Sequence, residues 1–388
     1  MTWWKAFAKR FRRKRKCALL DVRSFSESRD GMIRNSADVG DYIRSLGPVS
    51  EMDRAWRQSP VFPDPYMAEL ADITVMPGTR LLLDGGKIAL SDEIVLGFKH
   101  FGFPPKLKSM QVSGGPVLTL LGGRRGGKSI RAGIHLTGEY EANYFHWIVE
   151  ILPRLFLSER LGVEPGLPLL VSEGLHENLY QLMDLVRSPS RPVIRLNPHL
   201  SYRVESLIYP SDVSRIFDVY DRAPGLDTTY LPVSLIKAMV TAIKQRVELP
   251  ATQYPKRLFV RRNSSYRLLM NQPEIEEVLV SEGFRAIDPE DLSVPEQVAL
   301  FSQSEMIVGP SGAALANMLW CRENCRVLVL HSDHPFKKYP YWDALARVSG
   351  IRISYLSGRR ANRVSGRREA HDDYSIDSER LLAALRER

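Results

Sequence analysis

Four polar side chains near the middle of the chain have helical spacing and are suited to acid–base chemistry. They follow one another at intervals of three, four and four residues: Asn143, His146, Glu150 and Arg154. One face of a helix would present all four. A carboxylate one turn from a histidine can orient the ring and raise the basicity of its far nitrogen. The spacing favours a general base built from His146 and Glu150, with an ordinary polar helix face as the alternative.

A second group of residues is suited to binding an anion. Arg261 and Arg262 end the strand-like run KRLFVRR and Arg267 follows it, and guanidinium groups bind phosphate oxygens with paired hydrogen bonds. Further along, the small residues of GPSGAALANML place backbone amides where a strand gives way to a helix, at Ser311, Gly312 and Ala313. The start of a helix favours negative charge. Together the two features predict an anion site, against the alternatives of surface charge and a tight turn.

The elements that carry these residues differ between the two halves. Segments from about 70 to 135 alternate or run apolar between Gly and Pro, which is typical of strands, and 141–162 is typical of one long helix that Pro153 would kink. From 256 onward, strands alternate with helices of about ten residues, which predicts a parallel sheet with its ligand beyond the strand ends. Capping-box spacing marks two helix starts, Asn271 with Glu274 and Ser293 with Glu296. Glu296 could equally hold ribose hydroxyls.

Length and composition place the chain among globular proteins of about two domains. It has 388 residues, of which 44% are hydrophobic and 26% charged, and it lacks an apolar run of 18 residues that could span a membrane. Three cysteines cannot form a disulfide framework, which favours a reducing compartment, and no metal site is expected from them. The expected segments are a basic amphipathic start (1–16), a loosely organised lead-in (17–65), an N-terminal domain (66–250), a C-terminal domain (256–350) and a tail with a helix (351–388).

The first sixteen residues carry nearly all of the net charge of +9. They contain eight cations and no acid, leaving +1 for the rest, so a nucleic-acid-binding surface is not expected. Trp3, Trp4, Phe7 and Phe11 would share one face of a helix opposite the cations. This composition is typical of a helix lying on an anionic membrane surface. A solvated basic tail and a nuclear-import-like run are the alternatives. The expected location is cytoplasmic, on the inner membrane face if the helix binds lipid.

The run GGRRGGKS, from Gly122 to Ser129, satisfies the spacing of a phosphate-binding P-loop. A P-loop must lead directly into a helix, whereas the following SIRAGIHLTG alternates like a strand. The sequence therefore predicts the tip of a hairpin between VLTLL and IRAGIHL. A nucleotide-binding protein that uses Lys128 is the rival hypothesis.

Taken in order, the motifs resemble family 61 glycosyltransferases over about 135–335. The residues that carry the resemblance are Asn143-Tyr-Phe-His146-Trp-x-x-Glu150-x-Leu-Pro153-Arg154, Arg262, Arg267-x3-Asn271, Gly283-Phe284, Glu296-Gln297 and Gly309-Pro-Ser311-Gly312-Ala313-x3-Asn317. Bacterial members of this family are often described as capsular polysaccharide biosynthesis proteins. Many members have His in place of Ser311 and Asp in place of Glu150.

The resemblance implies an α/β fold of the GT-B type, with two Rossmann-like domains of parallel sheets facing a cleft. It implies inverting, metal-independent sugar transfer from a nucleotide sugar to a saccharide acceptor, without a cofactor. In that reaction His146 and Glu150 are catalytic, and Asn143 and Arg154 bind substrate. The residues expected to bind the donor are Arg262, Arg267, Asn271, Glu296, Ser311, Gly312, Ala313 and Asn317. A non-catalytic scaffold for polysaccharide assembly is a third hypothesis.

Overall fold

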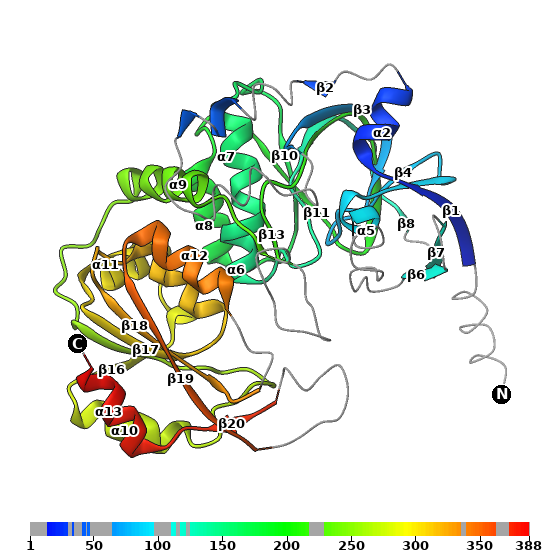
Figure 1. The fold of residues 1–388 in the computed structure, drawn as a ribbon. Coiled ribbons are helices and arrows are strands. Elements are labelled where there is room, and N and C mark those ends of the chain that lie inside the picture. Colours follow the sequence, from blue (N-terminus) through cyan, green and yellow to red (C-terminus); the bar gives the residue numbers. More distant parts are fainter. Residues whose placement is uncertain are drawn as a thin grey trace, which may run out of the picture.

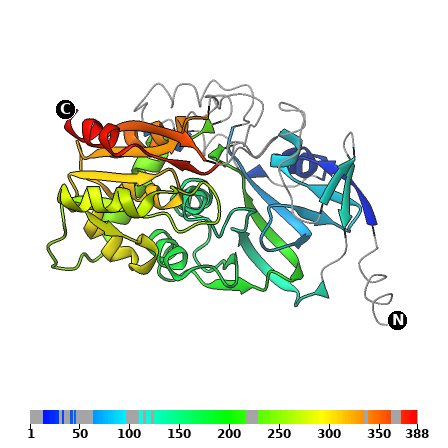
Figure 2. The same cartoon turned by 90° about the horizontal axis from the view of Figure 1, so that it is seen from below.

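The structure, a computed structural model, describes residues 14–29, 33–34, 41–43, 45–46, 64–96, 110–113, 117–121, 125–216, 229–334, 339–361 and 372–387. This part of the chain is α/β and contains a twelve-stranded sheet, a six-stranded sheet and a two-stranded pair. The two large sheets lie toward opposite ends of the molecule with helices between them (Figures 1 and 2). None of the described helices is long and apolar enough to cross a membrane.

The twelve-stranded sheet is mixed, so the expectation of a parallel sheet in the first half is wrong. Its strands run β11-β10-β9-β12-β3-β4-β5-β1-β7-β6, with β2 and β8 paired at the side. The strands β9, β10, β11 and β12 pair in parallel, but β12 pairs antiparallel with β3 from Tyr202–Val75 to Pro210–Met67. In β3, buried positions are interrupted by exposed ones, as expected of an antiparallel strand with one face partly open to water.

The bounds of these strands are β1 (Lys14–Leu20), β2 (Ile33–Arg34), β3 (Met67–Val75), β4 (Leu82–Asp84), β5 (Ile88–Leu90), β6 (Met110–Ser113), β7 (Val117–Leu121), β8 (Arg125–Gly126), β9 (Ile130–His135), β10 (Leu169–Ser172), β11 (Val193–Leu196) and β12 (Leu200–Pro210). The pair is β13 (Arg215–Ile216) and β14 (Thr229–Tyr230).

Residues 14–29 form a strand and a helix, partly within the segment expected to be a loosely organised lead-in. Strand β1 pairs with β5 and β7, and its Cys17 and Leu19 are buried. Helix α2 (Val22–Ser28) follows, capped by the Asp21 carboxylate, which accepts a hydrogen bond from Ser24 N at 2.7 Å. A short helix, α5 (Asp92–Leu96), lies next to β1. Because β1 begins at Lys14, the expected basic helix cannot extend to residue 16, and its residues 1–13 lie outside the described part.

The long helix predicted for 141–162 contains a π-helical segment. It comprises α6 (Tyr144–His146), the π-helix η2 (Trp147–Ile151) and α7 (Leu152–Arg160). Pro153 has no backbone N–H, so it cannot donate to the carbonyl of Val149 one turn earlier. The Ser214 hydroxyl donates to that carbonyl instead. The predicted distortion is therefore present as a π-bulge, which is common at functional sites.

The six-stranded sheet confirms the predicted parallel order of the second half. Its order is β16-β15-β17-β18-β19-β20, and every neighbour is parallel except β20. The strands are β15 (Arg257–Val260), β16 (Arg285–Ile287), β17 (Met306–Pro310), β18 (Arg326–Ser332), β19 (Arg352–Arg360) and β20 (Tyr374–Ser375). Strand β19 pairs with β18 along its length, so residues 351–361 belong to the sheet and not to a separate tail.

The helices of this half begin largely where the capping signals indicate. They are α10 (Gln272–Ser281), η3 (Pro289–Asp291), α11 (Val294–Gln303), η4 (Ala313–Trp320), α12 (Pro340–Ser349) and α13 (Ser378–Arg386). The capping box of Ser293 and Glu296 is confirmed. The segment 313–320, expected to be an α-helix, is a 3-10 helix.

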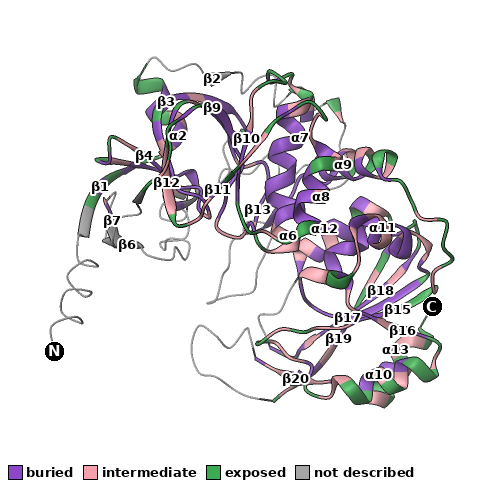
Figure 3. Ribbon diagram, turned by 180° about the vertical axis from the view of Figure 1, so that it is seen from behind, coloured by how far each residue is buried: buried purple, intermediate pink, exposed green. Residues whose placement is uncertain are grey.

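One continuous hydrophobic core joins the two sheets. It includes apolar residues of α7, of α8 (Glu177–Val186), of α9 (Val233–Arg246), and of α11, α12, β15 and β17. The buried purple band in Figure 3 follows these central helices. A separate cluster covers the other face of the six-stranded sheet, where α10 and α13 contribute Ile275, Leu279 and Leu381. The core between the sheets positions the start of α6 against η4.

Candidate active site

His146 and Glu150 are brought together as the spacing predicts. The imidazole Nδ1 lies 3.1 Å from Glu150 Oε2, and the His146 side chain is 20% exposed whereas that of Glu150 is 1% exposed. The two atoms lie within ion-pair distance, but no hydrogen bond joins them. Tyr140 stacks on the ring with centroids 4.7 Å apart. The pair thus has a buried carboxylate and a histidine at the protein surface.

Two arginines and a backbone amide surround the Glu150 carboxylate. Arg215 Nη1 lies 3.3 Å from Oε2 and Arg80 Nη2 lies 3.8 Å from it, while Ile216 N donates to Oε1 at 2.9 Å. Arg80 also pairs with Asp212. Burial opposes the charge on Arg80, but the carboxylates of Asp212 and Glu150 outweigh it and raise the pKa of Arg80. The Glu150 carboxylate is therefore held by two guanidinium groups and one backbone amide.

Asn143 and Arg154, expected to bind substrate, have structural partners here. Asn143 caps α6, because its Oδ1 accepts from the amides of Phe145 and His146 at 3.0 and 3.4 Å. The Arg154 side chain is fully buried and donates to three backbone carbonyl oxygens, those of Pro210, Thr137 and His135. The π-bulge between them shifts the register of the helix face. Their substrate-binding roles stay predictions that these contacts do not favour.

Arg262 and Arg267 form a cationic pair in the loop after β15. Both guanidinium groups lie over the Tyr266 ring, 5.4 and 5.2 Å from its centroid. Neither has a carboxylate within ion-pair distance among the described residues, whereas Arg261 is bound to Glu276 and Asp288. Burial, and then the charge of Arg267, lower the pKa of Arg262 to about 10. Arg262 Nε and Nη2 bond the carbonyls of Tyr266 and Arg267 and the Ser264 hydroxyl, so an anion would use Arg262 Nη1 and Arg267 and would supply the missing negative charge.

Arg267 has two further features of a binding residue. Its φ of 54° lies in the left-handed region, which costs a non-glycine residue about 1–2 kcal/mol. Its Nε is buried and has no hydrogen-bond partner in the described part of the chain. Strained backbone and an unsatisfied buried donor are both retained most often where a ligand uses them. These features fit the predicted anion site.

The glycine loop after β17 lies against this pair. A Cβ on Gly312 would overlap with Arg262 Nη1, so the close approach requires glycine. The Ser311 amide donates to the carbonyl of Leu330 at 2.8 Å, and the Ser311 hydroxyl accepts from Trp342 Nε1 at 3.2 Å. The amide of Ser311 is thus used within the fold and does not point at a ligand. Ala313 begins η4 directly after the loop.

The other expected donor-binding residues are engaged in structural contacts. Asn317 is buried at the junction of the two halves, where its Oδ1 accepts from Tyr144 OH at 2.8 Å and Trp320 Nε1 at 3.0 Å. The Asn271 side chain bonds the backbone of Ile376, and the Glu296 carboxylate bonds Ser293. The capping alternative therefore accounts for Glu296.

The elements that carry the two candidate half-sites contact each other at η4. Tyr144 on α6 bonds Asn317 on η4, and Phe145 packs on Trp342 of α12 with ring centroids 5.1 Å apart. His146 is the last residue of α6, and Gly312 directly precedes η4. Figure 1 shows α6 beside α12 at the junction between the two sheets. The arrangement places a base-like pair and an anion site on either side of one contact.

The P-loop-like run does not enter a helix. Lys128 is exposed, Ser129 bonds the carbonyl of Arg203, and β9 begins at Ile130, which confirms the predicted strand. The predicted hairpin is wrong, because β7 pairs with β1 and β6 whereas β9 pairs with β10 and β12. Lys128 lines an open groove of about 940 Å³ beside β9 and β11, away from the residues of the two half-sites.

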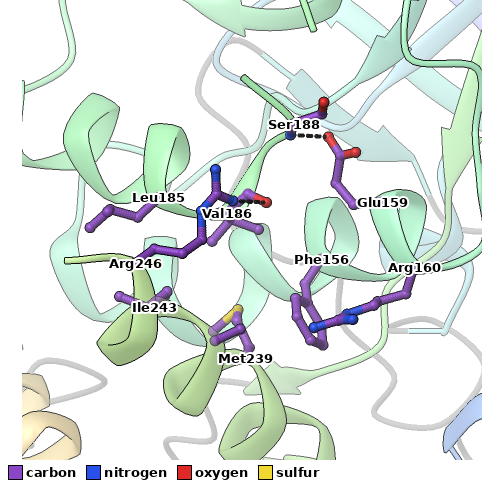
Figure 4. A pocket seen from close by; sticks show the side chains of 10 residues that line it. Phe156, Glu159, Arg160, Leu185, Val186, Ser188, Met239, Ile243 and Arg246 are labelled. Carbon is purple, nitrogen blue, oxygen red and sulfur yellow. Dashed lines mark hydrogen bonds between the residues drawn. The ribbon is translucent and has the colours of Figure 1, made fainter. Parts of the chain in front are cut away.

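Neither a second pocket nor a cluster of metal-ligating side chains adds a reaction centre in the described part of the chain. A pocket of about 220 Å³ lies between α7, α8 and α9, where Phe156, Met239 and Ile243 line it and Arg160 and Arg246 border it (Figure 4). It contains none of the residues that the sequence singled out. No three His, Cys, Asp or Glu side chains converge as metal ligands in the described part of the chain.

The contact between Gly312 and Arg262 gives a direct test of the anion site. Gly312→Ala should displace the guanidinium and weaken nucleoside diphosphate binding roughly 10- to 100-fold, the cost of one or two charged hydrogen bonds. Equilibrium titration measures it. Gly166→Ala is the matched control, since a Cβ there meets only the end of the Glu164 side chain, at 3.9 Å. Equal affinity in the two variants would show that the loop does not position Arg262 for a ligand.

Sequence reasoning missed Arg80, Arg215 and Asp212. Arg80 lies in the run TRLLL, and Asp212 and Arg215 lie three residues apart in SDVSRIF, each next to apolar or small residues. More than sixty residues separate each of them from His146 and from Glu150. A lone charge inside an apolar run indicates a buried ion pair, because an unpaired buried charge is costly. That signal identifies the residues but not their partner.

Residues 144–328 match the family model for Glycosyltransferase 61, a little less than half of the chain. The matched region contains His146, Glu150, Arg262, Arg267 and Gly312. This match supports a family 61 glycosyltransferase, as the motifs predict. No curated protein matches the chain.

Proposed function

We propose that this chain is an inverting, metal-independent glycosyltransferase that moves a sugar from a nucleotide sugar to a saccharide acceptor. The observation that carries the proposal is that α6, which contains His146, contacts η4, which directly follows the loop that touches Arg262. One pair is suited to activating a hydroxyl group, and the other is suited to holding a diphosphate. The family match over 144–328 spans both. A GT-B arrangement, with the donor bound by the second half, accords with this division.

The reaction follows from the two pairs. The His146–Glu150 pair accepts the proton of an acceptor hydroxyl as its oxygen attacks the anomeric carbon from the face opposite the diphosphate. The bond between that carbon and the phosphate oxygen breaks, and the nucleoside diphosphate leaves with the electron pair. Arg262 and Arg267 stabilise the charge that develops on the leaving group. Because the arginines supply positive charge, the proposal needs no metal ion.

The test of this function is turnover of a panel of nucleotide sugars with saccharide acceptors in the presence of EDTA. Release of a nucleoside diphosphate, together with a product of inverted anomeric configuration by NMR, is expected. Turnover that requires a divalent metal, or retained configuration, would contradict the mechanism. A stable fold that binds no nucleotide would favour the non-catalytic scaffold instead.

We also propose that the basic start of the chain holds the enzyme at an anionic membrane surface, where lipid-linked acceptors of capsular or other cell-surface polysaccharides are made. The support is the sequence of residues 1–16, with eight cations beside four aromatic rings. A cytoplasmic location on the inner membrane face accords with it.

Deleting residues 1–13, which precede β1, should abolish sedimentation with anionic vesicles while the melting temperature changes little. Each cation near an anionic surface contributes about 1 kcal/mol, and the deletion removes five of them. Neutral vesicles serve as the control. Unchanged binding to anionic vesicles would show that residues 1–13 do not hold the protein at the membrane, and the proposed transferase activity would be unaffected.

A further inference from the structure

We infer that His146 is the proton acceptor and that Glu150 is not, because Glu150 is buried with its oxygens held by Ile216 and Arg215 and serves to position the ring. This inference rests on the proposed transfer reaction for its catalytic meaning. It assigns roles to two arginines, and it decides which member of the pair is the base.

The contacts of Glu150 leave it no role as a base. Both oxygens accept a hydrogen bond, Oε1 from the amide of Ile216 and Oε2 from Arg215 Nη1. With the side chain 1% exposed, an acceptor hydroxyl cannot reach either oxygen directly. Two guanidinium groups within 4 Å attract the carboxylate and hold it in place.

His146 has the complementary properties. Its Nδ1 faces Glu150, so the carboxylate favours the tautomer with the proton on Nδ1 and leaves Nε2 as the acceptor. The ring is partly exposed and held by the Tyr140 stack on one side and the edge of Phe145 on another. The carboxylate also stabilises the imidazolium that forms when Nε2 takes a proton.

The arginines set the charge of this group. Asp212 balances Arg80, and Glu150 balances Arg215, so the four side chains sum to zero before His146 is protonated. Among the described residues, the other titratable groups near this cluster are Glu139, which accepts from the Arg80 amide, and His135, Arg154 and Tyr209, which interact electrostatically with Arg80. Tyr140 lies on the His146 ring, and Tyr341 of α12 lies across Phe145. Removing the charge of Arg215 should therefore make protonation of His146 easier, and removing that of Glu150 should make it harder.

The test follows His146 directly by nitrogen-15 NMR of histidine-labelled protein, with the signal assigned through His146→Gln. In the wild type, the neutral ring should carry its proton on Nδ1. Glu150→Gln should lose that preference and lower the titration midpoint by about one pH unit, whereas Arg215→Gln should raise it by up to about one unit. Arg203→Gln, at an exposed arginine paired with Asp72, is the control and should shift nothing.

The same variants are then compared in the pH dependence of kcat/KM. The fall of kcat/KM at acidic pH should persist in Glu150→Gln and move to higher pH in Arg215→Gln. It should return to its wild-type position in Arg215→Lys and vanish in His146→Gln. A fall that survives in His146→Gln and vanishes in Glu150→Gln would overturn the assignment. An Nε2-protonated ring, or a midpoint unmoved by both Glu150→Gln and Arg215→Gln, would overturn it as well. Absence of turnover in the wild type with every nucleotide sugar would instead overturn the proposed function, since the NMR result does not depend on it.

Discussion

Replacing His146 with alanine should lower kcat for sugar transfer by about 10²- to 10⁴-fold, the usual contribution of a positioned general base. The physical reason is that the imidazole is the partly exposed member of a pair whose carboxylate is buried. Donor affinity should change little, because the anion site lies on the other half of the chain. Single-turnover kinetics at saturating donor and acceptor measures the chemical step separately from binding.

The matched control for this variant is His199→Ala, at an exposed histidine on the turn before β12. It should keep wild-type kcat and a wild-type melting temperature. If His146→Ala stays within a few-fold of the wild type, the base assignment is wrong. A loss confined to KM would also contradict it, because a base acts on the transition state rather than on ground-state binding.

Replacing Arg267 should separate stability from binding. Arg267→Gly relieves a non-glycine residue at φ 54° and should raise the free energy of unfolding by about 1 kcal/mol. The same change removes a guanidinium whose Nε has no partner, so nucleoside diphosphate affinity should fall roughly 10- to 100-fold. Denaturant unfolding and equilibrium titration measure the two effects on one protein.

Arg267→Ala isolates the charge, since alanine keeps the strained backbone and lacks the guanidinium. It should lose as much affinity as Arg267→Gly without the gain in stability. The charge also makes binding sensitive to ionic strength, so the salt dependence of nucleotide affinity should be steeper in the wild type than in either variant. Unchanged affinity in both variants would remove Arg267 from the donor site.

The sequence predicts well where periodicity is local. The parallel sheet of the second half, the Ser293–Glu296 cap and the strand after Lys128 depend on a few neighbouring residues, and the structure contains all three. The contact of His146 with Glu150 depends on helical spacing alone and is also present.

Long-range pairing could not be predicted in the same way. The partner of β1 is β7, about a hundred residues away, and the partner of Glu150 is Arg215 on β13. No periodic pattern records such pairings. Arg154 shows the converse, because spacing placed it on the face of His146, whereas the π-bulge at 147–151 rotates it into a buried site with three carbonyl partners.

We expect the second half to bind the diphosphate of a nucleotide sugar without metal. Equilibrium binding tests this most directly. UDP, GDP, CMP and ATP, each with Mg²⁺ and with EDTA, are titrated into the wild type, Arg267→Ala and Lys128→Ala. Metal-independent binding of one nucleoside diphosphate, lost in Arg267→Ala and kept in Lys128→Ala, is the expected result and identifies the base of the donor. Mg²⁺-dependent binding of ATP, lost in Lys128→Ala and kept in Arg267→Ala, would contradict the account and favour a P-loop at Gly122–Ser129.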